Sequence, residues 1–244
     1  MQVHIFKSAA QVGQAAATMI AAQILRKPDS ILGLATGSSP IPTYQNLVAM
    51  HRAGVLDFSQ TISFNLDEYV GIDPQHPCSY HRFMHDNLFS QVNMKPENIH
   101  IPDGNAADLS AAAQAYDDAI CAAGGIDLQL LGIGHNGHIG FNEPGEHFVY
   151  GCHEVQLSQS TIEANTRFFD SAEDVPRSAV SLGVGSIMQA RQVLLIATGA
   201  DKAEAVRRSL EGEVSPQWQA SILRTHPDAV FLLDEASASL LTDK

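Results

Sequence analysis

The sequence is poor in cysteine and has no long apolar run. Its three cysteines, Cys78, Cys121 and Cys152, are widely spaced and odd in number, which argues against a disulfide framework and against a zinc site. No apolar run approaches the roughly 18 to 20 residues that span a bilayer, so we expect no membrane segment. Residues 1–6 lack the basic and long apolar regions of a secretion signal, and together with the cysteine usage this indicates a cytoplasmic protein.

Positively charged residues are also scarce. The 244-residue chain has 14 lysines and arginines against 27 acidic residues, which gives a formal net charge of −13. This excess of negative charge disfavours DNA, RNA and anionic membrane surfaces, so we expect no nucleic-acid or membrane partner. A small phosphorylated ligand would need a local site made of backbone N–H groups and a few cations.

The apolar pattern alternates between the periods of helices and strands. Ser8 is a candidate cap for a first helix, which ends before Pro28. Further helices are expected near residues 44–54, 79–89, 109–120 and 203–210, and strands near 31–35, 61–66, 99, 126–131, 193–197 and 230–233. This alternation predicts an α/β fold with a single doubly wound, largely parallel sheet and helices on both faces, as in Rossmann-like proteins. No repeat or linker divides residues 1–244, so we expect a single domain.

Polar segments follow four of the expected strands. They are residues 36–39, 67–69, 132–144 and 198–202. In open α/β sheets, ligands bind beside the carboxyl ends of the strands. We therefore expect these segments to meet in one crevice.

The segment 132–144 is rich in glycine. Gly132, Gly134 and Gly137 match a G-x-G-x-x-G spacing, but a dinucleotide site needs that turn to open a helix near the start of a βαβ unit. This loop lies mid-chain and runs into Pro144, which opposes a continuing helix. We therefore do not interpret it as a nucleotide site.

The same loop carries side chains that transfer protons. His138 has Asn136 two residues before it and Glu143 five residues after it. A carboxylate or amide that fixes the tautomer of an imidazole is the arrangement that general acid–base catalysis needs. The alternative is a hydrogen-bonded structural histidine.

A second candidate site is the turn between a strand and a helix that is formed by Thr36, Gly37, Ser38 and Ser39. Free N–H groups and hydroxyls at a helix N-terminus suit a phosphate, whereas the alternative is a plain turn with a serine N-cap. The turn lacks the Gly-Lys-Ser/Thr of a P-loop, so we do not infer ATP. Arg167 and Lys202 are the candidate cations for this phosphate. A lysine near a helix start opposes the helix dipole, a cost that an anionic ligand would offset.

Asp67 and Glu68 follow directly on an expected strand. Because side chains alternate along a strand, only one of the two is expected to face the crevice. A carboxylate there is a candidate base for a proton beside a carbonyl or iminium carbon. The alternative is a solvated acidic pair that caps a loop.

Taken together, these motifs resemble the glucosamine-6-phosphate deaminase family (glucosamine/galactosamine-6-phosphate isomerases), which shares a wider fold group with 6-phosphogluconolactonase and ribose-5-phosphate isomerase. The matching segments are residues 34–40, 64–71, 76–80, 132–144, 166–169, 175–176 and 183–185. The resemblance implies isomerisation with hydrolytic deamination of D-glucosamine 6-phosphate to D-fructose 6-phosphate and ammonia, in amino-sugar (N-acetylglucosamine) catabolism. It implies a sugar-phosphate ligand and neither a metal nor an organic cofactor.

The resemblance also implies roles for individual residues. Asp67 moves a proton between C1 and C2 through an enolamine, and His138 transfers the proton at the ring oxygen, supported by Asn136 and Glu143. A lid over residues 146–167 excludes water. The implied phosphate ligands are Thr36, Gly37, Ser38, Ser39, Arg167 and Lys202.

Regulation is a point of departure from part of that family. Members that N-acetylglucosamine 6-phosphate activates carry arginine and lysine after the Asn-Glu-Pro motif, whereas residues 145–159 contain neither here. We expect a monomer or small homo-oligomer with hyperbolic kinetics rather than an allosteric hexamer. Two other functions are possible alternatives. One is a 6-phosphogluconolactonase, which needs no base at Asp67. The other is a non-catalytic sugar-phosphate sensor, which the acidic net charge and the lack of a basic helix-turn-helix disfavour.

Overall fold

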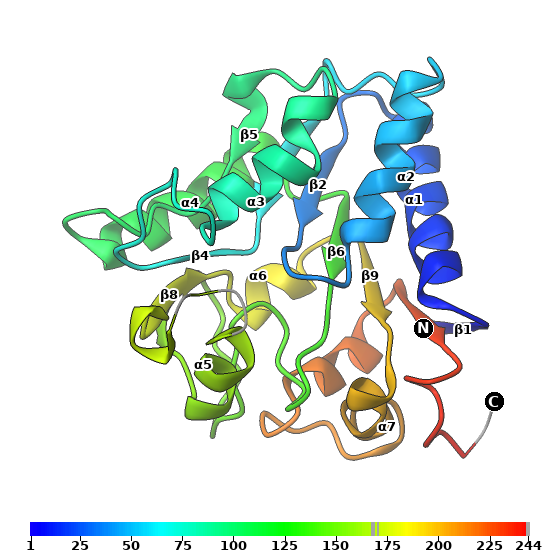
Figure 1. Ribbon diagram of the computed structural model, residues 1–244, viewed down its shortest axis with the longest axis vertical. Coiled ribbons are helices and arrows are strands. Elements are labelled where there is room, and N and C mark those ends of the chain that lie inside the picture. Colours follow the sequence, from blue (N-terminus) through cyan, green and yellow to red (C-terminus); the bar gives the residue numbers. More distant parts are fainter. Residues whose placement is uncertain (167–168, 170, 243–244) are drawn as a thin grey trace.

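A seven-stranded parallel sheet forms the centre of the computed structural model, which describes residues 1–166, 169 and 171–242 (Figure 1). Its strand order is β1-β10-β9-β6-β2-β3-β5, and every pairing is parallel. The strands are β1 (Gln2–Phe6), β2 (Ile31–Leu34), β3 (Ile62–Asn65), β5 (Ile99–His100), β6 (Leu128–Leu131), β9 (Gln192–Ala197) and β10 (Ala229–Asp234).

A smaller antiparallel sheet lies beside it, with the order β4-β8-β7. Its strands are β4 (Asp67–Tyr69), β7 (His153–Gln156) and β8 (Ser178–Ser181). The helices are α1 (Ala9–Arg26), α2 (Ile41–Arg52), α3 (Tyr80–Asn87), α4 (Leu109–Ala123), α5 (Gln159–Asn165), α6 (Val184–Met188) and α7 (Ala203–Glu211). Most of them flank the large sheet, whereas α5 lies beside the small sheet (Figure 1).

The core forms where apolar runs of the sequence become buried strands. Residues 193–197 and 229–233 have at most 2% of their surface exposed, which is the pattern of strands that are covered on both faces. The Ser8 side chain accepts a hydrogen bond from the Gln11 N–H and caps α1, as predicted. Among the described residues, no helix is long and apolar enough to cross a membrane.

The chain reverses its direction of strand addition between β2 and β6. From β2 the sheet grows through β3 to β5 on one side, and it then continues through β6, β9 and β10 on the other. In open α/β sheets such a switch point leaves a crevice at the carboxyl ends of the strands. The expected ligand site therefore lies beyond Leu34 and Leu131, where these two strands end.

The predicted α/β class and the largely parallel sheet are confirmed. The expected strands and helices are present, but the N-terminal strand β1 and the whole small sheet were not predicted. Asp67 and Glu68 do not simply end a strand, because the chain passes from β3 through Leu66 into β4 of the second sheet. The switch between sheets places Asp67 at the boundary of the two.

Candidate active site

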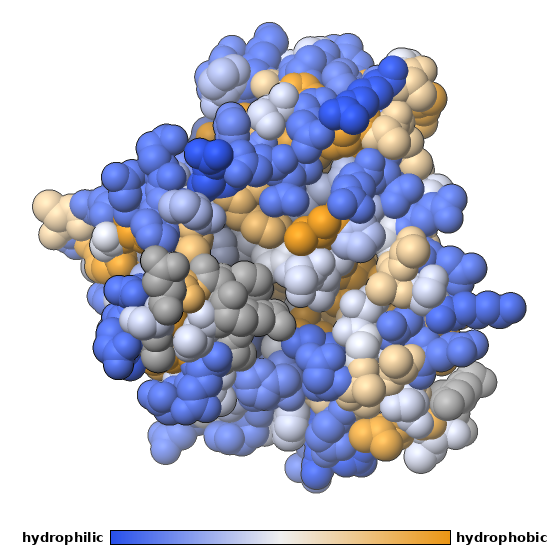
Figure 2. Space-filling view, in the orientation of Figure 1, coloured by the Kyte–Doolittle hydropathy of each residue, from blue (hydrophilic) through white to orange (hydrophobic). Residues whose placement is uncertain are grey.

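A cavity of about 360 Å³ opens at the switch point, a volume within the range of small-molecule sites, roughly 300–1,000 Å³. Its lining comes from segments that follow β2, β3 and β6, together with α3, α5 and Lys202. Figure 2 shows that this face of the molecule is mostly hydrophilic, with less polar residues around a recess near its centre. The four predicted polar segments therefore meet in one crevice.

His138 lies in this cavity beside Glu143. The His138 Nδ1 atom is 3.6 Å from Glu143 Oε2, and the two side chains are 18% and 10% exposed. Asn136 Nδ2 donates a hydrogen bond of 2.7 Å to the same Glu143 oxygen. The structure thus brings together the imidazole, amide and carboxylate that the sequence placed on one loop. The distance from imidazole to carboxylate is that of an ion pair rather than of a hydrogen bond, and such contacts often tighten only when ligand binds.

The surroundings of Glu143 hold it in the ionised form. Burial alone would raise the pKa of Glu143, but the interaction with His138 and the hydrogen-bond donors Thr161 and Asn136 lower it to about 2. Thr161 Oγ1, on α5, donates to the second carboxylate oxygen, Oε1. Glu143 can therefore stabilise a positive charge on His138 at neutral pH.

Glycine is needed in this loop for steric reasons. A Cβ atom at Gly134 would lie 2.3 to 2.5 Å from three atoms of the His138 ring. Gly134 N–H also donates to the His138 carbonyl at 2.9 Å. The loop does not open a helix, since the next regular element is β7, which confirms that the G-x-G-x-x-G spacing is not a nucleotide turn.

Asp67 is buried in the cavity wall, with 5% of its surface exposed. Burial, and then the negative charge of Glu68, raise the pKa of Asp67 to about 8, and a hydrogen bond with Thr36 opposes this only in part. Its Oδ1 atom has no hydrogen-bond partner within the described residues. Glu68 does not line the cavity, so the prediction that one carboxylate of the pair faces the crevice is confirmed. A buried carboxyl with a raised pKa is suited to accept a proton from carbon.

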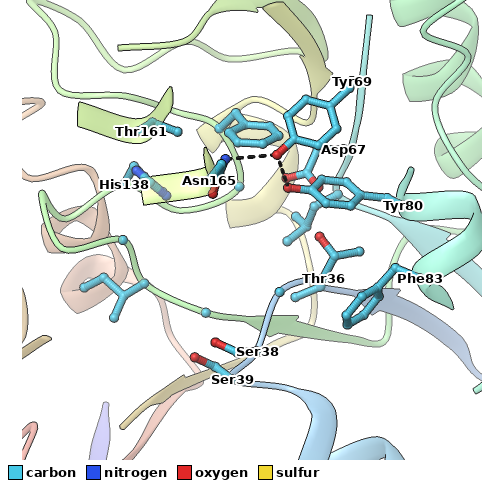
Figure 3. Close-up of a pocket in the computed structure, with 18 of the residues that line it drawn as sticks. Thr36, Ser38, Ser39, Asp67, Tyr69, Tyr80, Phe83, His138, Thr161 and Asn165 are labelled. Carbon is cyan, nitrogen blue, oxygen red and sulfur yellow. Dashed lines mark hydrogen bonds between the residues drawn. The ribbon is translucent and has the colours of Figure 1, made fainter. Parts of the chain in front are cut away.

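The turn after β2 lies at another side of the cavity. Figure 3 shows Ser38 and Ser39 apart from the group formed by Asp67, Tyr69 and Tyr80. Gly37 has a φ of 89°, which places it in the left-handed region. The alternative of a serine N-cap is wrong, because the residue at the N-cap of α2 is Pro40 and no side chain caps that helix.

Of the two predicted cations, only Lys202 can be placed. It lines the cavity from the N-cap position of α7, is 20% exposed, and has its Nζ 3.5 Å from Asp201 Oδ2. Arg167 lies outside the described residues. Among the described lining residues Lys202 is the one lysine or arginine, and it therefore supplies local positive charge in a chain that is acidic overall.

Comparison with known proteins identifies the relatives of this chain. The family model described as glucosamine-6-phosphate isomerases/6-phosphogluconolactonase matches residues 6–232. The chain belongs to this family. A glucosamine-6-phosphate deaminase of Clostridioides difficile is 50% identical over 244 residues, which are 100% of this chain and 98% of that protein. One from Thermoanaerobacter pseudethanolicus is 48% identical over 100% of this chain and 96% of its own length.

A solved structure of a similar protein agrees with the fold. It is described as a monomeric glucosamine-6-phosphate deaminase and superposes with a TM-score of 0.97 at 43% identity, over 99% of this chain and 100% of that one. The family includes both isomerases and lactonases, so membership alone does not choose between the two reactions. The side chains of the cavity must do so.

Several cavity residues of this family member were not predicted from sequence. Asn165 Nδ2 donates to the Tyr69 hydroxyl at 2.9 Å, and Tyr80 OH donates to the same hydroxyl at 3.3 Å (Figure 3). His135, between Gly134 and Asn136, also lines the cavity; burial and the nearby charges of His138 and Lys202 lower its pKa. Position in a loop of histidine and glycine was the available signal for His135, whereas nothing local marks Asn165. Among the described residues, no group of three or more metal-binding side chains could hold a metal ion.

Proposed function

We propose that this chain converts D-glucosamine 6-phosphate and water into D-fructose 6-phosphate and ammonia, as a step of amino-sugar catabolism. One observation carries the proposal: a single cavity is lined by a buried carboxyl with a raised pKa, an imidazole beside an ionised carboxylate, a lysine, and a turn with two serines. These are the groups that proton transfer at carbon, proton transfer at oxygen and phosphate binding require. Relatives that share about half of its residues are named for the same reaction.

In this proposal the phosphate of the substrate binds to Thr36, Gly37, Ser38, Ser39 and Lys202. The turn offers N–H groups and hydroxyls at the start of α2, and a helix N-terminus favours an anion. Lys202 offers a charged donor. Arg167 is a further proposed phosphate ligand.

His138 then opens the sugar ring. It delivers a proton to the ring oxygen as the bond from that oxygen to C1 breaks, and it regains a proton as the hydroxyl on C1 loses its own to give an aldehyde. Glu143 stabilises the positive charge on the imidazole, and Asn136 holds Glu143 in place through its 2.7 Å hydrogen bond. This is general acid–base catalysis by an imidazole that a carboxylate orients.

Asp67 carries out the isomerisation. In its ionised form it removes the proton from C2 while the aldehyde oxygen takes a proton from the neighbouring ammonium group, which gives an enolamine with a double bond between C1 and C2. It returns a proton to C1, which leaves an iminium at C2. Water adds to that carbon and ammonia departs, so that C2 becomes the ketone of fructose 6-phosphate. We place a lid over residues 146–167, which would exclude water until the iminium forms.

We further propose that the chain acts as a monomer with hyperbolic kinetics. The solved structure that it resembles over its whole length is described as monomeric. Residues 145–159 also lack the lysine and arginine that an anionic activator would need. A sigmoidal rate curve that N-acetylglucosamine 6-phosphate makes hyperbolic would contradict this.

The experiment that tests the function measures ammonia and fructose 6-phosphate released from D-glucosamine 6-phosphate without added metal. We expect equal amounts of the two products from the wild type and a loss of at least about 1,000-fold in Asp67→Asn, because a carbon acid reacts slowly without its base. Asp118→Asn, an exposed carboxylate in α4, is the control and should retain full activity. Lactone hydrolysis that survives Asp67→Asn, without deamination by the wild type, would instead indicate a 6-phosphogluconolactonase.

A further inference from the structure

Glu68, the neighbour of the proposed base, is one of the most completely hydrogen-bonded side chains near the cavity. It is 2% exposed. Its Oε1 accepts from the N–H groups of Tyr69 at 2.9 Å and Tyr80 at 3.0 Å. Its Oε2 accepts from the His81 N–H at 3.0 Å and lies 2.9 Å from His81 Nδ1. Three backbone donors face the two oxygens, and a protonated carboxyl would direct its own O–H against one of them. The Glu68 side chain therefore accepts from the backbone at both of its oxygens.

These contacts join β4 to the start of α3. Tyr80 and His81 are the first two residues of α3, and their N–H groups have no partner inside the helix. Ser79 caps the next position by accepting from the Arg82 N–H, and the Glu68 carboxylate satisfies the two N–H groups before it. A negative charge at a helix N-terminus is also favourable. Glu68 thus fixes the position of Tyr80, whose side chain lines the cavity beside Asp67.

Asp67 and Glu68 lie in different surroundings although they are adjacent. Alternation along β4 directs Asp67 into the cavity and Glu68 toward α3. Asp67 has a hydrogen bond with Thr36 and an unpaired Oδ1, whereas Glu68 has four close polar contacts. Two neighbouring carboxyls resist ionising together. Burial, and then the charge of Glu68, raise the pKa of Asp67.

Among the titratable groups around Asp67, Glu68 is the one whose charge raises the Asp67 pKa. Burial raises the pKa of the surrounding phenols and raises that of the Cys152 thiol to about 12, so all of these are neutral at pH 7. The phenols belong to α2, β4, α3 and α4 and are Tyr44, Tyr69, Tyr80 and Tyr116. His138 and Lys202 face the same cavity, and His81 lies on the far side of Glu68 and is 38% exposed.

We propose that Glu68 is a positioning residue of this site: its anchorage to the first turn of α3 fixes Asp67 and Tyr80 against the substrate, and its fixed negative charge sets the pH range over which Asp67 acts as a base. The inference rests on the proposed deaminase function, in which Asp67 transfers the proton between C1 and C2. Glu68 does not itself touch the substrate, because it does not line the cavity.

The test compares the pH dependence of kcat/KM for deamination in the wild type, Glu68→Gln and Asp86→Asn. Glutamine keeps the shape and one acceptor oxygen but removes the charge, so we expect the acidic limb to move to lower pH by about one to two units. Asp86→Asn removes a negative charge from the exposed side of α3, the helix to which Glu68 is hydrogen-bonded. Asp86 is 48% exposed and pairs with Arg82. The acidic limb of this variant should stay in place, because the charge is screened by water.

A second measurement does not depend on the Glu68 variant folding or on turnover. Infrared spectra of the wild type minus those of Asp67→Asn isolate the Asp67 carboxyl, and its protonated band should persist until the pH approaches about 8. A band that disappears at the ordinary pH of a carboxyl overturns the proposal, as does a folded Glu68→Gln whose acidic limb stays in place. Absence of ammonia release by the wild type would instead refute the proposed function, and the infrared result would still stand.

Discussion

Replacing the proposed base should make the protein more stable as well as inactive. Asp67 is 5% exposed, and its pKa is raised from an ordinary 3.8 to about 8. The folded protein therefore binds a proton that the unfolded chain releases. Because the folded-state pKa is the higher one, the contribution of Asp67 to the free energy of unfolding is greatest below pH 3.8, where Asp67 is protonated in both states. This contribution of the bound proton is lost as the pH rises through about 8. The neutral amide of the Asp67→Asn variant would carry no such cost.

The size of the effect follows from the interval between the two pKa values. Each pH unit within that interval costs at most about 1.4 kcal/mol. At pH 7, after allowing for relaxation around the charge, we expect Asp67→Asn to raise the free energy of unfolding by roughly 2–4 kcal/mol. For a chain of this length that corresponds to a rise in Tm of roughly 4–16 °C.

Thermal unfolding of both proteins between pH 5 and 9 measures this. The gap in Tm should widen from pH 5 to about pH 8 and then stay constant, while Asp118→Asn should follow the wild type throughout. A gap that is the same at every pH would mean that asparagine only packs better. No gap at all would refute the argument that Asp67 is held in a site that penalises its charge.

Three further predictions concern the loop, the phosphate site and the lid. Gly134→Ala places a methyl group against the His138 ring, so we expect kcat to fall about 100-fold or more. Circular dichroism should show that the variant still folds. The control is Gly145→Ala, whose added methyl group would make only an ordinary contact at 3.7 Å. Lys202→Ala should raise KM for the sugar phosphate about 10- to 100-fold with a smaller effect on kcat, and Lys95→Ala should change neither. Fructose 6-phosphate should slow proteolysis between residues 150 and 165, and an unchanged cleavage rate would argue against a lid there.

The main sheet was predictable from sequence because its strands are short apolar runs. Strands β9 and β10 consist almost entirely of Val, Leu, Ile, Ala and Phe, and this composition is enough to predict that they are buried. Strand β1 was missed because it lies at the edge of the sheet, where the first three of its five residues are exposed, so it lacks an apolar run. The small sheet was missed because β7 and β8 have four residues each, and their pairing depends on partners far away in the chain.

The site was predictable to the extent that its groups lie close together in the sequence. Asn136, His138 and Glu143 share one loop, so their convergence needed only glycine bends. Alternation showed that one carboxylate of the pair at 67 and 68 would face the crevice, but which one depends on how β4 pairs with β8. The contact from Thr161 to Glu143 spans 18 residues and that from Asn165 to Tyr69 spans 96, and no spacing rule reaches across such distances.

The two proposed proton-transfer groups belong to different parts of the fold, so contacts between these parts must hold the groups at a fixed separation. Asp67 lies in the small sheet, whereas His138 lies in the loop after β6 of the large one. Three buried hydrogen bonds connect these parts: Phe141 N–H to Ser181 Oγ at 3.0 Å, Asn142 Nδ2 to the Leu182 carbonyl at 2.8 Å, and Leu182 N–H to the Leu66 carbonyl at 2.8 Å.

Two of these contacts start from the His138 loop and the third ends beside Asp67, so together they run from the imidazole to the carboxyl through β8 and Leu182. Asn142 is 4% exposed and Ser181 is fully buried, and buried hydrogen bonds of this kind are costly to break. A rigid link is what proton transfers at two neighbouring positions of one substrate require, because misplacement of a reacting group by about 1 Å can cost 100-fold in rate. The small sheet, which no single segment of the sequence predicts, therefore fixes the proposed base relative to the imidazole.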